Sequence, residues 1–160
     1  HVFHFATALR NCMEMVRVGG RLFLHTVVNN FCGHGFYQFS PELFYTALSE
    51  ENGFAVETMV LHRAGPGSRW YAVSNPKVIR SRVELVGCVP MMLLVQARRH
   101  RAVTVFARTP QQSDYTVRWD DSSQPGSKAQ PYTAPRPALA RCLPGVAPLP
   151  GHPARSAHAK

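Results

Sequence analysis

The sequence has few cysteines and no long apolar run, and both absences narrow the classes of protein to which it can belong. Its four cysteines, at positions 12, 32, 88 and 142, are scattered and form no C-x-x-C pair. This spacing argues against a disulfide framework or a structural zinc site and is typical of reduced thiols in a cytoplasmic protein. The longest nearly apolar run, residues 83–97, is interrupted by Glu84, Pro90 and Gln96 and is too short to span a bilayer. We therefore expect a soluble, cytoplasmic protein without a membrane partner.

Acidic residues are also scarce. The 160 residues include 9 Asp and Glu against 18 Lys and Arg, which gives a formal net charge of +9. The segment 63–108 carries one acidic residue, Glu84, and nine basic residues, at 63, 69, 77, 80, 82, 98, 99, 101 and 108. Such a segment can contact phosphate, an anionic substrate or nucleic acid. Because no nucleic-acid-binding motif accompanies the charge, we expect a solvated arginine-rich face rather than a nucleic-acid partner.

The periodicity of apolar residues predicts a helix and then a strand at the start of the chain. Residues 5–17 carry apolar side chains at i, i+3, i+4 and i+7 spacings and predict an amphipathic helix that ends at Gly19-Gly20. Residues 21–28 follow as a strand with apolar residues on both faces. Two-sided apolarity is typical of a buried, parallel-type strand with helices over both faces. His25 within it is expected to be a core histidine with one hydrogen bond.

A second helix is predicted to begin after Ser40, which is a favourable N-cap and is followed by Pro41 and Glu42. We expect this helix to stop at Asn52-Gly53 and two further strands to cover residues 54–61 and 91–98. Residues 69–90 look like an insertion in which Pro76 opens a short helix. The last residues are rich in Pro, Ala, Gly and Ser, which predicts a disordered tail. The expected fold is an α/β domain over residues 1–118, with three strands and flanking helices, followed by a tail over 119–160.

The segment between the first strand and the second helix is dense in side chains that can hold a polar ligand: Asn29, Asn30, His34, Tyr37 and Gln38, interleaved with Phe31, Phe36 and Phe39. Ligands of open α/β sheets bind beyond the carboxyl ends of the strands, which is where this loop is expected to lie. Aromatic walls with a few hydrogen-bonding groups are typical of a small-molecule pocket. The alternative is an ordered loop whose polar side chains bond its own backbone. For the cluster as a whole we favour the pocket.

Two other kinds of site are conceivable in the same loop. Gly33-His34-Gly35 invites comparison with a dinucleotide-binding turn, but Gln38 stands where the third glycine is needed, and the acidic partner would fall near Glu57, inside a strand. Cys32, His34 and His25 could ligate a metal ion, but no fourth ligand stands at a standard spacing. We expect no metal site.

The order of these features resembles the second half of a class I S-adenosylmethionine-dependent methyltransferase. The resemblance rests on a helix, the run VGGRLFLHTVVNN (18–30), a loop, a helix, NGF (52–54) and a strand. The opening His1-Val2-Phe3 is similar to the segment that borders the cofactor in that family. The runs GHGFYQFSPELF (33–44) and PQQSDY (110–115) are similar to a subgroup of bacterial methyltransferase-like proteins. The resemblance covers residues 1–118.

This resemblance implies a Rossmann-like fold of which the chain is the C-terminal half, and a transfer of the methyl group of S-adenosylmethionine to a small-molecule acceptor. His34 would be the general base, and His1 and Val2 would border the cofactor. The acceptor would be bound by Asn29, Asn30, Tyr37 and Gln38. An oxygen, nitrogen or carbon of the acceptor would displace the methyl group, with much of the acceleration coming from alignment.

The glycine-rich loop and the acidic residue that hold the cofactor in the family have no counterpart here. We expect them in a missing N-terminal half of the same domain, which makes this chain a fragment. In the family's sheet order the last strand lies antiparallel between the other two, so the strand 21–28 would expose an unpaired flank. The isolated chain is then expected neither to bind the cofactor tightly nor to fold robustly. The alternative to an enzyme is a non-catalytic, methyltransferase-like binding module whose basic surface contacts an anionic partner.

Overall fold

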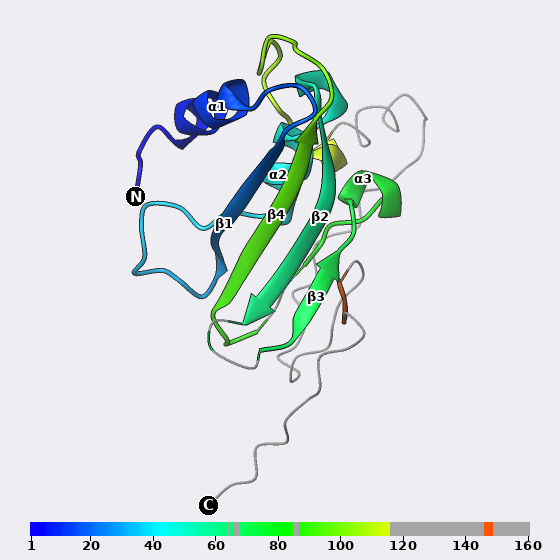
Figure 1. The fold of residues 1–160 in the computed structure, drawn as a ribbon. Coiled ribbons are helices and arrows are strands. Elements are labelled where there is room, and N and C mark those ends of the chain that lie inside the picture. Colours follow the sequence, from blue (N-terminus) through cyan, green and yellow to red (C-terminus); the bar gives the residue numbers. More distant parts are fainter. Residues whose placement is uncertain (64, 66–67, 85–86, 116–145, 149–160) are drawn as a thin grey trace, which may run out of the picture.

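The computed structural model describes residues 1–63, 65, 68–84, 87–115 and 146–148, and it is an α/β structure built on one sheet (Figure 1). The elements in chain order are α1 (Phe5–Met15), β1 (Arg21–Asn29), α2 (Pro41–Ala47), the 3-10 helix η1 (Glu50–Asn52), β2 (Phe54–Arg63), β3 (Trp70–Val73), α3 (Pro76–Ile79), β4 (Met91–Arg99) and β5 (Val146–Pro148). The α/β class, the two main helices and the three main strands agree with the sequence prediction. No helix in the described ranges is long and apolar enough to cross a membrane.

The sheet has the strand order β1-β4-β2-β3-β5, and every neighbouring pair is antiparallel. β4 lies between β1 and β2: Val95 is opposite Leu24 on one side and opposite Met59 on the other. Because β1 and β2 are both antiparallel to β4, they run in the same direction. This confirms that the last of the three predicted strands lies antiparallel between the other two. Antiparallel pairing throughout differs from the mostly parallel pairing of Rossmann-like sheets.

Two short strands extend the sheet beyond β2, and the sequence did not predict either of them. β3 pairs with β2, and β5 pairs with β3. β5 falls within the range 119–160 that was expected to be a disordered tail; the other residues of that range lie outside the described residues. The short helix at Pro76 is confirmed as α3, whose first turn is capped by Asn75 through a 3.0 Å hydrogen bond from the Lys77 amide.

β1 is an edge strand, and the prediction of a buried, parallel-type strand is wrong. Among the described strands β1 pairs only with β4, so its other flank is unpaired, as the resemblance implied. Leu22 and Leu24 are half-buried, whereas the alternating residues Phe23 and His25 are exposed, and Phe23 is 61% exposed. The strand is apolar on both sides, yet α1 and α2 pack on only one of them. His25 is therefore not in the core.

The C-terminal end of α1 is held by a buried arginine from β4. Arg99 is only 8% exposed, and its Nη1 donates to the carbonyl oxygens of Met13 at 3.2 Å, Glu14 at 3.0 Å and Val16 at 2.7 Å. The last turn of a helix leaves C=O groups without an i+4 amide partner, and of these three carbonyls that of Met13 also accepts a 3.3 Å hydrogen bond from the Val16 amide. A guanidinium at this end also interacts favourably with the helix dipole. Arg99 thereby joins α1 to the centre of the sheet.

α2 begins as predicted and ends earlier. Ser40 is its N-cap, accepting a 3.3 Å hydrogen bond from the Leu43 amide, and Pro41 is its first residue. The helix stops at Ala47, and η1 leads the chain to Gly53, which has φ 75°. A Cβ at Gly53 would collide with the carbonyl oxygen of Arg101, so glycine is needed there both for the turn and for the close approach.

The hydrophobic core lies between the sheet and the two helices. The largest fully buried side chains are Phe54, Met13, Leu48, Leu61, Leu93, Val95 and Val105. Alternate residues of β4, from Met91 to Ala97, point into this core, as expected for a central strand with one covered face. The other side of the sheet, which we call the open face, faces the viewer in Figure 1, with α2 behind the strands.

The strand register defines the rows of the open face. From one end to the other the rows are Val27, Met92, His62 and Trp70; His25, Leu94, Val60 and Ala72; Phe23, Gln96 and Thr58; and Arg21, Arg98 and Ala55. Each row crosses the strands because residues opposite each other in a pleated sheet point to the same side. The open face thus joins side chains that are far apart in the sequence.

Candidate functional site

The predicted ligand-binding loop lies directly after the carboxyl end of β1, and Asn30 anchors its start. Asn30 has φ 57°, and its Nδ2 donates to the carbonyl oxygens of Gly87 at 2.8 Å and Val89 at 3.0 Å. Asparagine tolerates this left-handed conformation better than most residues. Its neighbour Asn29 is the last residue of β1 and is partly buried. Asn30 therefore ties the loop to the segment before β4.

His34 lies at the exposed tip of the loop and contacts the first residue of the chain. Its Nε2 is 3.3 Å from Nε2 of His1, and the two rings meet edge to face with centroids 4.7 Å apart. The backbone passes close by: a Cβ on Gly35, which has φ 74°, would lie 3.3 Å from the backbone nitrogen of His1. The structure thus brings together His34 and His1, which the resemblance assigned to acceptor chemistry and to the cofactor border. Val2, the other residue of that border, is 57% exposed.

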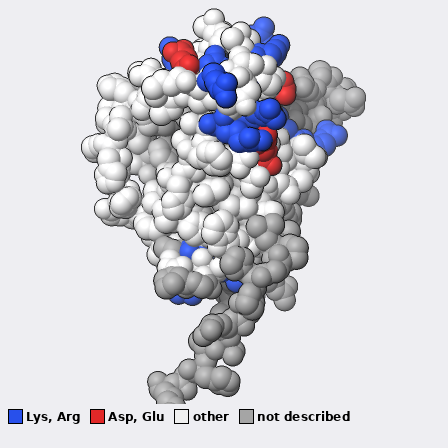
Figure 2. Space-filling view, in the orientation of Figure 1, with Lys and Arg blue, Asp and Glu red and all other residues white. Residues whose placement is uncertain are grey.

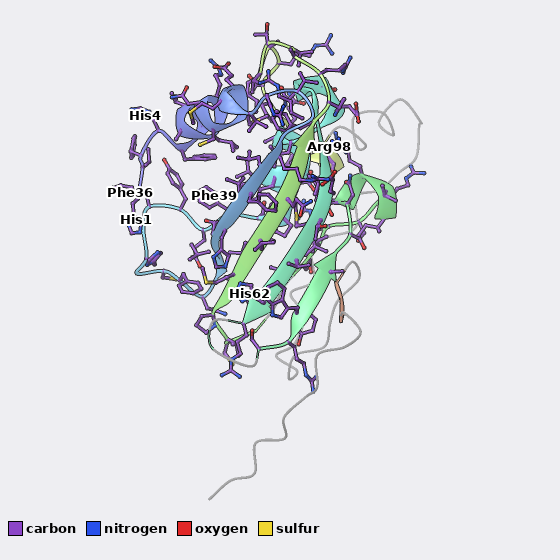
Figure 3. The ribbon with its side chains drawn as sticks, viewed as in Figure 1. His1, His4, Phe36, Phe39, His62 and Arg98 are labelled. Carbon is purple, nitrogen blue, oxygen red and sulfur yellow. The ribbon has the colours of Figure 1, made fainter. Side chains whose placement is uncertain are left out.

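Tyr37 strengthens the same contact between the loop and the start of the chain. Its hydroxyl donates to the carbonyl oxygen of Phe3 at 2.8 Å, and its ring lies 5.2 Å from that of Phe5. Phe36 meets Phe3 edge to face at 5.9 Å. Figure 3 shows His1 and Phe36 on this side of the molecule, beyond the edge of β1. The residues around His1 and the loop form one packed aromatic cluster.

Gln38 is used within the loop itself. Its Oε1 accepts from the Phe31 amide at 2.8 Å, and its Nε2 is 3.7 Å from Sγ of Cys32. Asn30, Tyr37 and Gln38 therefore bond backbone or loop groups, which is the arrangement of the ordered-loop alternative. His34, by contrast, has an exposed ring that contacts the rings of His1 and Phe31.

The described residues also form a cleft that the loop residues do not line. It has a volume of about 390 Å³ and is lined by Ser40, Glu42, Leu43, Thr46, Arg82, Val83, Glu84, Pro110, Gln111 and Gln112. Glu42 organises one wall, because its Oε1 accepts from the Ser113 amide at 2.9 Å and from Oγ1 of Thr46 at 3.1 Å. The sequence reasoning missed this cleft, although two of the runs on which the resemblance rests, 33–44 and 110–115, meet there.

Arg82, which lines the cleft, forms an ion pair with Asp114. Nε of Arg82 donates to Oδ2 of Asp114 at 2.6 Å, and this hydrogen bond raises the pKa of Arg82 above its ordinary value. Oδ1 of the same carboxylate is buried and has no hydrogen-bond partner among the described residues. The segment 69–90, expected to be an insertion, thus contributes Arg82 to the same wall as the motif PQQSDY.

The open face carries a second group of polar side chains that the sequence reasoning did not connect. Nε2 of His25 is 2.8 Å from Nε2 of His62, and Glu57 accepts from Nε of Arg21 at 2.7 Å and from Nε2 of Gln96 at 2.6 Å. His25 has the single hydrogen bond expected of it, but at the surface. No local sequence signal could reveal these groups, because they come from three different strands.

The other two kinds of site find no support in the geometry of the loop. Gly33-His34-Gly35 precedes α2 by several residues, so its amides do not form the start of that helix as a phosphate-binding turn requires. Within the described ranges no group of three or more His, Cys, Asp or Glu side chains is placed to hold a metal ion. Cys32, His34 and His25 do not form such a group.

The functional interpretation rests on three structural features. These are an antiparallel sheet with one open face, an ordered aromatic loop at the carboxyl end of β1, and a cleft lined in part by α2. Comparison with protein-family models, with curated protein sequences and with solved structures returned no match.

Proposed function

We propose that this chain is the C-terminal part of a class I S-adenosylmethionine-dependent methyltransferase that acts on a small-molecule acceptor. The observation that carries the proposal is the order β1-β4-β2, in which β4 runs against two strands of common direction. That is the order that the sequence resemblance implies for the end of the family's sheet. The parallel strands of the fold would belong to the half that carries the cofactor loop, so antiparallel pairing here is compatible with the proposal.

The contact between the start of the chain and the loop supports the same proposal. In the family, the segment like His1-Val2 borders the cofactor, and the loop after the next strand faces the acceptor. Here His1 lies 3.3 Å from His34, and Tyr37 bonds the carbonyl of Phe3. Two segments that must cooperate in methyl transfer are therefore neighbours, although more than 30 residues separate them in the chain.

The described residues can supply only part of a cofactor site. Exposed His1 and Val2 offer one ring and one apolar side chain, so most of the contacts to the cofactor must come from elsewhere in the protein. When bound, S-adenosylmethionine supplies an electrophilic methyl group on a sulfonium. The role left to the residues of this chain is to orient the acceptor and to take up its proton.

His34 is the residue proposed to take up that proton. As the acceptor's lone pair forms its bond to the methyl carbon and the bond from sulfur to that carbon breaks, the acceptor proton would move to a free imidazole nitrogen of His34. An imidazole can do this near neutral pH. Contact with His1 would hold the ring at the loop tip, and the aromatic cluster around Tyr37 would keep the loop in position.

The proposal is tested in the protein extended at its N-terminus by the residues encoded upstream of His1. We expect methyl transfer from radiolabelled S-adenosylmethionine, and a His34→Ala variant slowed about 100-fold or more, in the range for loss of a general base. Cys32→Ala, an exposed neighbour in the same loop, is the control and should keep its rate. A full rate of His34→Ala across the pH range would show that His34 is not the general base. Absence of methyl transfer by the unsubstituted extended protein would show that it is not a methyltransferase.

The non-catalytic binding module remains the second candidate because of one observation. The predicted acceptor-binding side chains Asn30, Tyr37 and Gln38 form their hydrogen bonds with the protein itself. A degenerate methyltransferase-like module needs an ordered loop but no free polar groups. The upstream sequence discriminates the two candidates: a G-x-G-x-G loop followed by an acidic residue at the end of a strand favours the enzyme.

A further inference from the structure

A row of aromatic rings crosses the open face, and the proposed function does not use it. His62 and Trp70 are directly opposite each other on β2 and β3, with ring centroids 5.1 Å apart and an interplanar angle of 19°. His25 on β1 lies one register row away and reaches across β4 to complete this ring row, with its centroid 5.1 Å from that of His62 and an angle of 17°. Figure 3 shows His62 on the side of the sheet turned toward the viewer. Three rings, with angles below 20° between neighbours, thus extend from β1 across β4 and β2 to β3.

Hydrogen bonds fix how the two histidines meet. Nδ1 of His62 is 3.0 Å from the carbonyl oxygen of Arg63, which can only accept, so Nδ1 carries the proton of the neutral ring. Nε2 of His62 is then the acceptor of the 2.8 Å hydrogen bond from His25. The centroid separation of 5.1 Å equals this nitrogen separation plus the two ring radii, so the rings lie end to end. Neither ring covers the face of the other.

Basic side chains stand at one end of the open face. Arg21 and Arg98 form the row four residues along β1 from His25, which is about 13 Å at the rise of a strand. Between them and the rings lies Phe23, which is 61% exposed. At the other end, exposed Arg63 is opposite the core residue Met91, so it alternates with His62 and belongs to the covered side of the sheet. Figure 2 shows Lys and Arg gathered at the upper end of this face and uncharged side chains at its centre.

We propose that the open face binds single-stranded nucleic acid. Bases stack on the ring row and on Phe23, while Arg98 contacts the phosphates; single-strand-binding proteins combine a basic surface with aromatic rings in this way. The sequence argued against a nucleic-acid partner because it holds no linear motif, but a surface assembled from β1, β2 and β3 leaves none. The net charge of +9 favours a polyanion over an acidic small molecule. This inference does not depend on the methyltransferase proposal.

Fluorescence anisotropy with a labelled short oligouridine tests the stacking. In low salt, the 160-residue chain should bind, and Trp70→Ala should weaken the affinity roughly 5- to 100-fold, as expected for the loss of one base-stacking ring. Trp70→Phe, which keeps a ring, should retain most of the affinity and shows that the loss does not come from misfolding. Phe36→Ala removes a ring that is 66% exposed but lies on the loop, so it should leave binding unchanged.

Two further measurements test how the strand is held. Arg98→Gln should reduce the slope of log affinity against log salt by about 0.7, the value for one phosphate contact on a single strand, while Lys77→Gln on α3 should not change it. In a Trp119→Phe background Trp70 is the remaining tryptophan, and its fluorescence should be quenched by the oligonucleotide.

Several results would overturn the inference. One is the absence of binding even in low salt; another is binding that Trp70→Ala leaves intact. Equal affinity for a duplex of the same length would also count against it, since paired bases cannot stack on the sheet. Self-association through the open face without oligonucleotide binding would show that the face meets a second copy of the chain instead.

Discussion

Single buried or paired side chains hold this structure together at the places where its elements meet. Arg99 is the clearest case, because one guanidinium nitrogen serves three carbonyls at the end of α1 while the rest of the group lies over the ring of Phe54 at 5.8 Å. The sequence pattern gives no sign of it: Arg99 stands between Arg98 and His100 in a run that looks solvent-exposed. Burial of an arginine depends on which carbonyls the fold brings nearby.

We expect Arg99→Met to lower the free energy of unfolding by about 2 to 4 kcal/mol, because it removes hydrogen bonds from a charged donor to buried carbonyls. Chemical denaturation followed by circular dichroism measures this change. Arg98→Met is the matched control: the neighbouring side chain is exposed, and its replacement should change stability by about 0.5 kcal/mol or less. Equal effects of the two substitutions would contradict the capping role of Arg99.

The ion pair between Arg21 and Glu57 gives a pH-dependent signal on the open face. The hydrogen bond from Arg21 lowers the pKa of Glu57 below its ordinary value, and the hydrogen bond from Gln96 adds to this. Because the folded-state pKa lies below the unfolded value, the pair favours the folded state above the unfolded pKa and loses this effect as the pH falls through the folded pKa.

We expect Arg21→Gln to raise the pKa of Glu57 toward its ordinary value, as measured by NMR titration of the side-chain carboxyl. Arg98→Gln should shift it less, because Arg98 acts on Glu57 only through its charge and is the smallest of the contributions. An unchanged Glu57 pKa in Arg21→Gln would show that the ion pair does not form in solution.

Among the elements, the loop after β1 depends on the left-handed conformation of Asn30. Replacement by alanine removes two hydrogen bonds and places at φ 57° a residue that tolerates the left-handed region less well than asparagine, so Asn30→Ala should cost about 1 to 2 kcal/mol. Asn30→Gly keeps the conformation but loses the bonds and should cost less. Limited proteolysis of the loop and thermal unfolding distinguish the two variants. Equal stability of the two would mean that the hydrogen bonds of Asn30, and not its backbone conformation, stabilise the loop.

β1 is the element most exposed to unwanted pairing. A nine-residue strand with one unpaired flank and an apolar side chain on its open side is a template for edge-to-edge association. We expect Phe23→Lys to reduce aggregation, measured by light scattering, with little change in stability, because Phe23 is already 61% exposed. Phe36→Lys removes a similarly exposed ring from the loop and should help much less. An equal reduction of aggregation by the two substitutions would mean that exposed apolar side chains in general, and not the unpaired edge of β1, cause the association.

An element could be predicted where the residues that determine it lie within the element itself. The start of α2 was predictable because Ser40 and Pro41 act on their own turn, and α1, β2 and β4 were predictable from apolar periodicity. β3 and β5 have four and three residues, too few for a period. The covering of β1 was predicted wrongly because apolar residues on both sides do not reveal whether helices pack on both sides.

At the scale of the whole molecule, the sequence predicted the loop but not the use of its side chains. Its position after β1 follows from strand direction, whereas the bonds of Asn30 to residues 87–89 and of Tyr37 to Phe3 depend on tertiary contacts. The cleft behind α2 and the ring row on the open face likewise join distant segments. The proposed place of this chain, as one end of a larger sheet, explains both the unpaired flank of β1 and the scarcity of cofactor contacts.

Calorimetric titration with S-adenosylmethionine tests this central claim most directly. The account predicts no micromolar binding to the 160-residue chain and micromolar binding to the protein extended by the residues encoded upstream of His1. Micromolar binding to the 160 residues alone, or none to the extended protein, would contradict it.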